Sequence, residues 1–289
     1  MRQRSISSVG VVIVGLVPAI MGGPVFAVVL VVLCLIGFAE YVRLARGIGG
    51  DPVPAGFIIV PAFGLAALLD GGDYAVLGIA AAALAVPITV EMFQPDLDGA
   101  FRDWSLAALG ALYLGMPVFA AVAMRRVSGD VDANWLHDLA SWASLGWNAA
   151  PRGLAWLALV IVVTWLSDTG AYLVGRPLGR HRLIPHVSPN KTWEGFVGGL
   201  VCASLTGALA IWLFGLGVNP LVGVVVGIVL SLVGVVGDLA ESVLKRQAGV
   251  KDSGDLIPGH GGMLDRIDAL LFTFPAGWLL AAFVDRYLT

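Results

Sequence analysis

The stretch "PLVGVVVGIVLSLVGVVGDLAESVLKR", from Pro220 to Arg246, decides the fold class of this protein. Between Leu221 and Gly237 its only polar side chain is that of Ser231. A helix of about 20 apolar residues spans the hydrocarbon core of a bilayer. The stretch therefore predicts a transmembrane helix, and it places Asp238 at the membrane boundary, where an acid is unusual.

The rest of the chain repeats this apolar pattern. Of its 289 residues, 58% are hydrophobic and 13% are charged, whereas about 25% of residues are charged in soluble domains. We therefore predict an all-α fold, a polytopic integral membrane helical bundle of about nine transmembrane helices. The candidate spans lie near residues 6–22, 24–43, 54–70, 74–92, 104–124, 153–175, 194–215, 219–240 and 267–285. The first span also has the pattern of a cleaved signal peptide.

Lys and Arg residues indicate the orientation, because the cytoplasmic loops of membrane proteins are enriched in them. With a cytoplasmic N-terminus and nine spans, 13 of the 17 Lys and Arg residues fall on the cytoplasmic side. This topology puts the two most polar segments, residues 176–193 and 241–266, on the face where nucleotides are available. The opposite loop, residues 125–152, carries Trp135 and Trp142 at helical spacing. It is either an amphipathic interfacial helix or a plain surface loop.

The composition also excludes several kinds of site. The net charge of −3 gives no reason to expect a nucleic-acid partner. Cys34 and Cys202 lie in separate apolar runs, so neither a disulfide framework nor a cysteine metal site is indicated. The four His residues lack the spacing of zinc ligands.

The segment "TWLSDTGAYLVGRPLGRHRLIPHVSPNKTWEG", Thr164 to Gly195, is the first of two that carry chemistry. Asp168 follows an apolar run, and an ionised carboxylate at membrane depth needs a counter-charge or a bound cation. Ser188, Lys191 and Thr192 stand just before the next helix. A helix N-terminus with hydroxyls and an ammonium group is suited to anions. We therefore predict that these residues bind phosphate.

The second segment is richer in ionisable residues. Asp238, Ser242 and Lys245 recur at spacings of four and three, which places an acid, a hydroxyl and a base on one face of a helix. The sequence "KDSGDLIPGHGG" follows, a glycine-rich loop whose backbone N–H groups suit phosphate. Asp265 and Asp268 then stand three residues apart at the start of the last helix, where we expect water to reach both. Carboxylates of this kind suit Mg²⁺ bound together with substrate phosphates.

Each feature has a plainer alternative. Glu241 and Asp238 are both spaced for a structural ion pair with Lys245, and Asp265 with Arg266 suits a membrane anchor. The clustering of carboxylates and cations at one membrane boundary nevertheless favours a phosphate and metal site. An ion-coupled transporter would instead place its acids at mid-membrane, between matching halves of the chain.

The stretch "SVLKRQAGVKDSGDLIPGHGGMLDRID", Ser242 to Asp268, resembles the signature of the phosphatidate cytidylyltransferases, or CDP-diacylglycerol synthases. "SDTGAYLVGR" and "SPNKTWEG" are similar to a second block of that family. The resemblance covers residues 155–285, and the N-terminal half is similar only in hydropathy. One departure is Arg180, where many relatives carry Lys.

The resemblance implies an integral membrane enzyme that converts CTP and phosphatidic acid to CDP-diacylglycerol and pyrophosphate. It implies Mg²⁺ as the cofactor, optionally with a second cation, and a homodimer among membrane lipids. We expect a prokaryotic plasma membrane, with the active site facing the cytoplasm. Two alternatives stay open: another CTP-dependent membrane lipid kinase, such as a polyprenol kinase, which releases CDP, and a lipid or ion transporter.

The residue chemistry and the resemblance together give the predicted site. We expect residues 1–150 to form N-terminal transmembrane helices and residues 151–289 the catalytic region of one integrated membrane domain. The expected catalytic residues are Asp238, Asp265, Asp268 and Lys245, and the expected metal ligands are Asp238, Asp265, Asp268 and Asp168. The expected substrate-binding residues are Ser188, Lys191, Thr192, Ser242, Arg246, Lys251, Asp252, His260, Gly261, Gly262 and Arg266.

Overall fold

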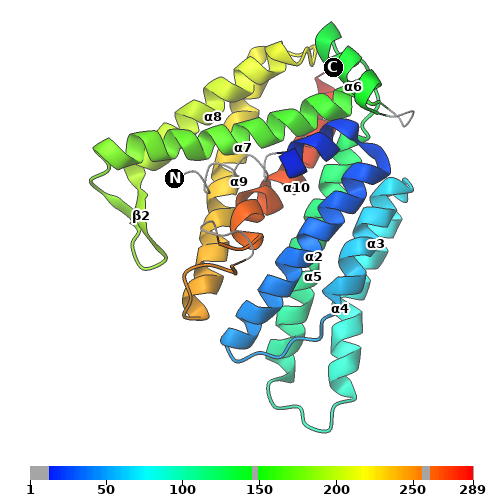
Figure 1. The fold of residues 1–289 in the computed structure, drawn as a ribbon, viewed down its shortest axis with the longest axis vertical. Coiled ribbons are helices and arrows are strands. Elements are labelled where there is room, and N and C mark those ends of the chain that lie inside the picture. Colours follow the sequence, from blue (N-terminus) through cyan, green and yellow to red (C-terminus); the bar gives the residue numbers. More distant parts are fainter. Residues whose placement is uncertain (1–12, 145–148, 256–260, 289) are drawn as a thin grey trace. The chain divides into compact units, whose positions relative to one another are not determined.

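The computed structural model describes residues 13–144, 149–255 and 261–288, which are almost entirely helical (Figure 1). Residues 13–21 form a first helix. The helices that follow are α2 (Gly23–Gly47), α3 (Gly56–Leu68), α4 (Gly72–Met92), α5 (Ala100–Arg125), α6 (Asn134–Ala143), α7 (Pro151–Leu178), α8 (Trp193–Leu213), α9 (Pro220–Gln247) and α10 (Leu264–Tyr287). Strands β1 (Arg182–Ile184) and β2 (Ser188–Thr192) pair as an antiparallel hairpin between α7 and α8. The prediction of an all-α fold is confirmed.

Seven of the described helices are long and apolar enough to cross a membrane: α2, α4, α5, α7, α8, α9 and α10. Each matches a span predicted from the sequence. The predicted span near residues 54–70 is the shorter apolar helix α3, which has 13 residues and contains Pro61. The span near residues 6–22 lies partly outside the described residues. The protein is therefore a polytopic membrane protein, and the count of nine spans stays a prediction.

The chain divides into two compact units. Unit 1 consists of Met1–Pro18, Gly23–Ala123 and Val243–Ile267, and unit 2 of Ala19–Gly22, Met124–Ser242 and Asp268–Thr289. Helices α9 and α10 each contribute residues to both units. The predicted site residues are therefore distributed over the two units.

In unit 1, aromatic packing fixes the last turns of α2. The rings of Phe38 and Phe57 meet edge to face, with their centroids 5.1 Å apart. The hydroxyl of Tyr41, whose residue is fully buried, donates to the carbonyl oxygen of Leu106 at 2.8 Å. Because these contacts flank Glu40 on the same helix, they hold this buried carboxylate in a defined place.

In unit 2, glycines let α7 and α8 approach each other closely. A β-carbon on Gly195 would lie 2.8 Å from the carbonyl oxygen of Ala171, and one on Gly199 would lie 3.0 Å from that of Ser167. Small residues at such spacing are the usual packing surface of membrane helices. This contact holds Ser167 and Ala171 against the start of α8.

Arg125, at the end of α5, is almost fully buried in unit 2. Its guanidinium donates to the carbonyl oxygens of Ala19 at 2.8 Å, Ile20 at 2.9 Å, Ala149 at 2.9 Å and Ala150 at 3.2 Å. These carbonyl oxygens solvate the charge of the Arg125 guanidinium in place of water. Arg125 is one of the four bases that the predicted topology places opposite the cytoplasm, and its contacts give it a structural role.

Replacing Arg125 with Leu is expected to lower the melting temperature in detergent by several degrees, because buried carbonyl groups lose their partner at about 1 to 3 kcal/mol each. The matched control is Arg286→Leu, since Arg286 is exposed at the end of α10. Equal melting temperatures for the two variants would show that the buried contacts of Arg125 contribute little.

Residues 134–143 form α6, so the helical alternative for the 125–152 loop is confirmed over this stretch. Leu136, Ala140 and Ala143 are buried, whereas Trp142 is 81% exposed and Trp135 is 49% exposed. The indole N–H of Trp135 donates to the carbonyl oxygen of Leu213 at 3.3 Å. A position of α6 in the membrane interface is consistent with its outward tryptophans and stays a prediction.

Candidate active site

The β1–β2 hairpin is fixed at its base by the first turn of α8. Gly179 ends α7, and the Thr192 hydroxyl caps α8 by accepting from the Gly195 amide at 3.1 Å. The carboxylate of Glu194 accepts from the Arg180 amide at 3.1 Å and lies 2.6 Å from Nδ1 of His181. These contacts hold the second strand so that Lys191 comes immediately before the α8 N-terminus.

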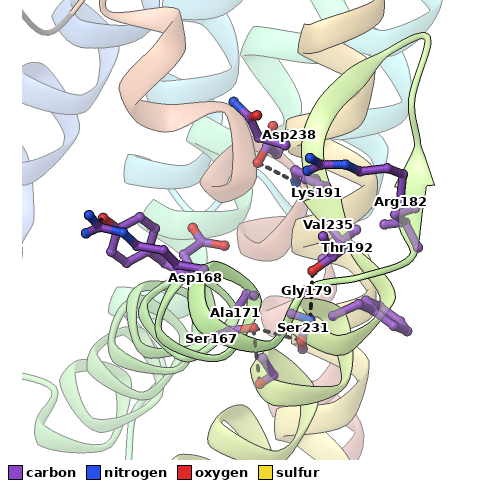
Figure 2. A pocket seen from close by; sticks show the side chains of 18 residues that line it. Ser167, Asp168, Ala171, Gly179, Arg182, Lys191, Thr192, Ser231, Val235 and Asp238 are labelled. Carbon is purple, nitrogen blue, oxygen red and sulfur yellow. Dashed lines mark hydrogen bonds and ion pairs between the residues drawn. The ribbon is translucent and has the colours of Figure 1, made fainter.

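A cavity of about 670 Å³ lies in unit 2, between the hairpin and helices α7, α8 and α9. Its acidic lining residues are Asp168 and Asp238, and its basic ones are Arg176, Arg182 and Lys191. Figure 2 shows Lys191 and Asp238 joined by an ion pair, with Arg182 nearby on the hairpin and Asp168 on α7. The cavity therefore offers both signs of charge to a ligand.

Asp238 pairs with Lys191, and the distance from Nζ to Oδ2 is 2.5 Å. Both side chains are partly exposed, 24% for Lys191 and 33% for Asp238. The other carboxylate oxygen of Asp238 lies 3.5 Å from the Ser242 hydroxyl, one helical turn along α9. The partner of Asp238 in the structure is thus Lys191 of the hairpin, and the ammonium of Lys245 donates to Asp265.

Hydroxyl groups line another part of the cavity. The side chains of Ser167 and Ser231 hydrogen-bond to each other at 2.8 Å, and both are buried. The sequence analysis did not assign them to the site. A polar residue within an apolar span was the available signal, but either serine alone also suits a bond to its own helix.

Asp268 belongs to the part of α10 that lies in unit 2. A β-carbon on Gly237 would lie 2.7 Å from the carbonyl oxygen of Asp268, so α9 and α10 touch at the residue before Asp238. The carboxylate of Asp268 is partly exposed and accepts from the Ala269 amide at 2.7 Å. Partial exposure agrees with the expectation that water reaches Asp268.

Asp265 lies in unit 1, and its carboxylate accepts hydrogen bonds from several donors. These are the Lys245 ammonium at 2.5 Å, the Ser253 amide at 2.8 Å, the Ser253 hydroxyl at 2.9 Å and the Gly262 amide at 2.9 Å. The side chains of Lys245 and Asp265 are only 11% and 9% exposed. The expectation that Asp265 is open to water is therefore wrong. As a metal ligand Asp265 stays a prediction.

Glu40 is a residue that the sequence analysis did not assign to the site. Its carboxylate accepts from the amides of Met263 at 2.9 Å and Leu264 at 2.8 Å, and from the Ser253 hydroxyl at 2.9 Å. An acid inside an apolar run was a signal for function. Its partners could not be named from the sequence, because they lie more than 200 residues away along the chain.

The remaining predicted substrate-binding residues have varied surroundings. Arg246 donates to the carbonyl oxygen of Val250 at 3.1 Å, and Lys251, Asp252 and Arg266 are exposed. Ser188 pairs with Ile184 in the hairpin and is not among the described residues that line the cavity. Gly261 has a positive φ of 78°. His260 lies outside the described residues.

The described residues contain no group of three or more His, Cys, Asp or Glu side chains placed to hold a metal ion by themselves. Mg²⁺ typically binds one or two carboxylates and completes its shell with water and substrate phosphates. The two acids of the unit 2 cavity, Asp168 and Asp238, fit that requirement.

Comparison with known proteins agrees with this site chemistry. The cytidylyltransferase family matches residues 2–284 of the chain. A phosphatidate cytidylyltransferase of Staphylococcus saprophyticus is 36% identical over 195 residues, which are 66% of this chain and 75% of that protein.

Two further relatives carry the same name. One from Staphylococcus haemolyticus is 47% identical over 123 residues, covering 43% of this chain and 47% of its own length. One from Staphylococcus epidermidis is 48% identical over 124 residues, covering 43% of this chain and 48% of its own length. The match to the family extends over nearly the whole sequence, and the chain belongs to the cytidylyltransferase family.

Proposed function

We propose that the protein is a phosphatidate cytidylyltransferase, which converts CTP and phosphatidic acid to CDP-diacylglycerol and pyrophosphate. The observation that carries the proposal is the unit 2 cavity, where the acids Asp168 and Asp238 stand among Arg176, Arg182 and Lys191. Such a mixture suits phosphates bound together with a divalent cation. The names of the relatives support the same reaction.

The reaction is a substitution at phosphorus. A phosphate oxygen of phosphatidic acid forms a bond to the α-phosphorus of CTP. The bond from that phosphorus to the oxygen bridging to the β-phosphate breaks, and pyrophosphate leaves with the electron pair. The attacking oxygen is already anionic, so no side chain has to remove a proton. The barrier comes mainly from repulsion between anions and from charge that develops on the leaving group, which positioned cations reduce.

The basic and the acidic residues of the cavity have different roles in this reaction. Arg176, Arg182 and Lys191 bind phosphate oxygens, and Lys191 exchanges its contact with Asp238 for a contact with substrate. Asp238 and Asp168 would hold Mg²⁺ there. Asp268 and Asp265 stay metal ligands predicted from the sequence alone. Bound Mg²⁺ supplies positive charge and orients the phosphate oxygens. The cations thereby bring two anionic substrates together in a defined orientation.

The purified protein tests this proposal directly. With CTP, phosphatidic acid and Mg²⁺ present, we expect pyrophosphate release that requires both substrates and stops when the metal is chelated. A CTP-dependent lipid kinase would release CDP, and a transporter would leave CTP intact. Either result would overturn the proposed function.

We further propose that the hairpin and the segment after α9 face the cytoplasm. Single cysteines at Arg182 and Val250, both exposed, are expected to resist an impermeant thiol reagent in intact cells and to react after permeabilisation. The background has Cys34 and Cys202 replaced, and Ser128→Cys, in the opposite loop, is the control that should react from outside. Labelling of either test position in intact cells would contradict this topology.

A homodimer is also part of the proposal and rests on the resemblance alone. Light scattering on the detergent-solubilised protein measures it, and a monomer at concentrations where the enzyme is active would contradict it.

A further inference from the structure

One hydroxyl group joins two carboxylates in unit 1. The Ser253 hydroxyl lies 2.9 Å from Oε2 of Glu40 and 2.9 Å from Oδ2 of Asp265. A hydroxyl has a single proton, so it donates to one of the two at a time. The position of the Asp265 carboxylate is therefore coupled, through Ser253, to that of Glu40, a residue on α2.

The Glu40 carboxylate also caps the N-terminus of α10. The amides of Met263 and Leu264 point at the two oxygens of Glu40 and have no partner within their own helix, because the first N–H groups of a helix are left over by its geometry. A negative charge at this end is also favoured by the helix dipole. Glu40 therefore fixes Met263 and Leu264 at the start of α10.

The position of Glu40 explains why residues 254 and 262 are glycines. A β-carbon on Gly254 would lie 2.8 Å from Oε1 of Glu40. A β-carbon on Gly262 would collide with Oε2 of Glu40 and with the Ser253 hydroxyl. Gly254 and Gly262 thus let the backbone come close to a buried acid. Phosphate binding by the glycine-rich loop stays a prediction.

We infer that Glu40 is a positioning residue of the active site: it holds Ser253, Met263 and Leu264, and through Ser253 it orients the Asp265 carboxylate, a predicted metal ligand. This inference rests on the proposed function for its effect on catalysis. It assigns a role in the site to a residue of the N-terminal half of the chain, where the sequence analysis placed no site residue; the family match, over residues 2–284, also extends beyond the residues 155–285 to which the sequence resemblance was limited.

The test uses Glu40→Gln in the full-length purified protein. The amide keeps the size of the side chain but turns one acceptor into a donor that faces backbone N–H groups. We expect the KM for CTP to rise about tenfold, as is typical when a supporting contact of a binding site is lost, with the KM for phosphatidic acid unchanged within twofold. A role in stability alone would lower the melting temperature and leave both KM values at the wild-type level.

Ser253→Ala provides a second route to the same result. It removes the shared hydroxyl and leaves Glu40 to cap α10, so it is expected to raise the KM for CTP in the same direction. Because the two side chains act in one chain of contacts, the KM for CTP of the double variant should lie within about twofold of that of Glu40→Gln alone. If Glu40→Gln does not fold, a wild-type KM for CTP in Ser253→Ala overturns the inference.

Amide hydrogen exchange separates this inference from the proposed function. The amides of Ser253, Met263 and Leu264 are expected to exchange faster in Glu40→Gln than in the wild type, whether or not the protein uses CTP. The matched control is Glu91→Gln, a second buried acid of unit 1 at the end of α4, which should leave both exchange and kinetics unchanged. Unchanged exchange in Glu40→Gln overturns the inference, whereas absent cytidylyl transfer by the wild type overturns the function.

Discussion

Asp238→Asn is expected to lower the rate of cytidylyl transfer at least about 100-fold while the protein still folds and inserts. Asp238 lines the unit 2 cavity, and its negative charge is balanced by Lys191, which lines the same cavity. Replacing the acid by its amide keeps the shape of the side chain and removes the charge that would hold Mg²⁺. We expect the remaining activity to require a much higher Mg²⁺ concentration.

The control for this prediction is Lys191→Met. If Asp238 only compensates Lys191, the two single variants should behave alike, with lower melting temperatures and an unchanged Mg²⁺ requirement. If Asp238 is a metal ligand, Asp238→Asn should shift the Mg²⁺ dependence, whereas Lys191→Met should weaken substrate binding. Near-normal turnover in a merely destabilised Asp238→Asn protein would remove Asp238 from the metal site.

Lys245→Met is expected to destabilise the protein by about 3 kcal/mol, because it leaves the charge of Asp265 buried without its partner. The two side chains are 11% and 9% exposed, so water cannot take the place of the ammonium without rearrangement. The measurement is thermal or denaturant unfolding in detergent. Loss of enzymatic activity is expected in the same variant.

The double variant Lys245→Met, Asp265→Asn separates the stability of this pair from its role in catalysis. Removing both charges leaves no unpaired ion, and such replacements are often neutral for stability. We therefore expect most of the lost stability to return while activity stays absent. Recovery of activity together with stability would show that Lys245 and Asp265 serve the fold alone.

The helices were predictable from the sequence because one physical requirement, a length of apolar residues matching the bilayer, dominates them. The described spans agree with that pattern from α2 to α10. The β1–β2 hairpin was not predicted. Its strands are three and five residues long and largely polar, and their position depends on Glu194, whose contacts with Arg180 and His181 a hydropathy pattern does not reveal.

The candidate site was predictable in its residue types but not in its pairings. Helical spacing placed Ser242 within reach of Asp238, and the structure has this contact at 3.5 Å. The ion pairs join residues of different elements: Lys191 of β2 with Asp238 of α9, and Lys245 of α9 with Asp265 of α10. Spacing within one helix carries no information about such partners, and for the same reason Glu40 had no assigned role.

The fate of each phosphate of CTP tests the central claim most directly. Two samples of CTP, labelled in the α- or the γ-phosphate, are incubated with the purified protein, phosphatidic acid and Mg²⁺. The account predicts that the α-label appears in the lipid product and the γ-label in pyrophosphate. Transfer of the γ-label to lipid with release of CDP, or no consumption of CTP, would contradict it.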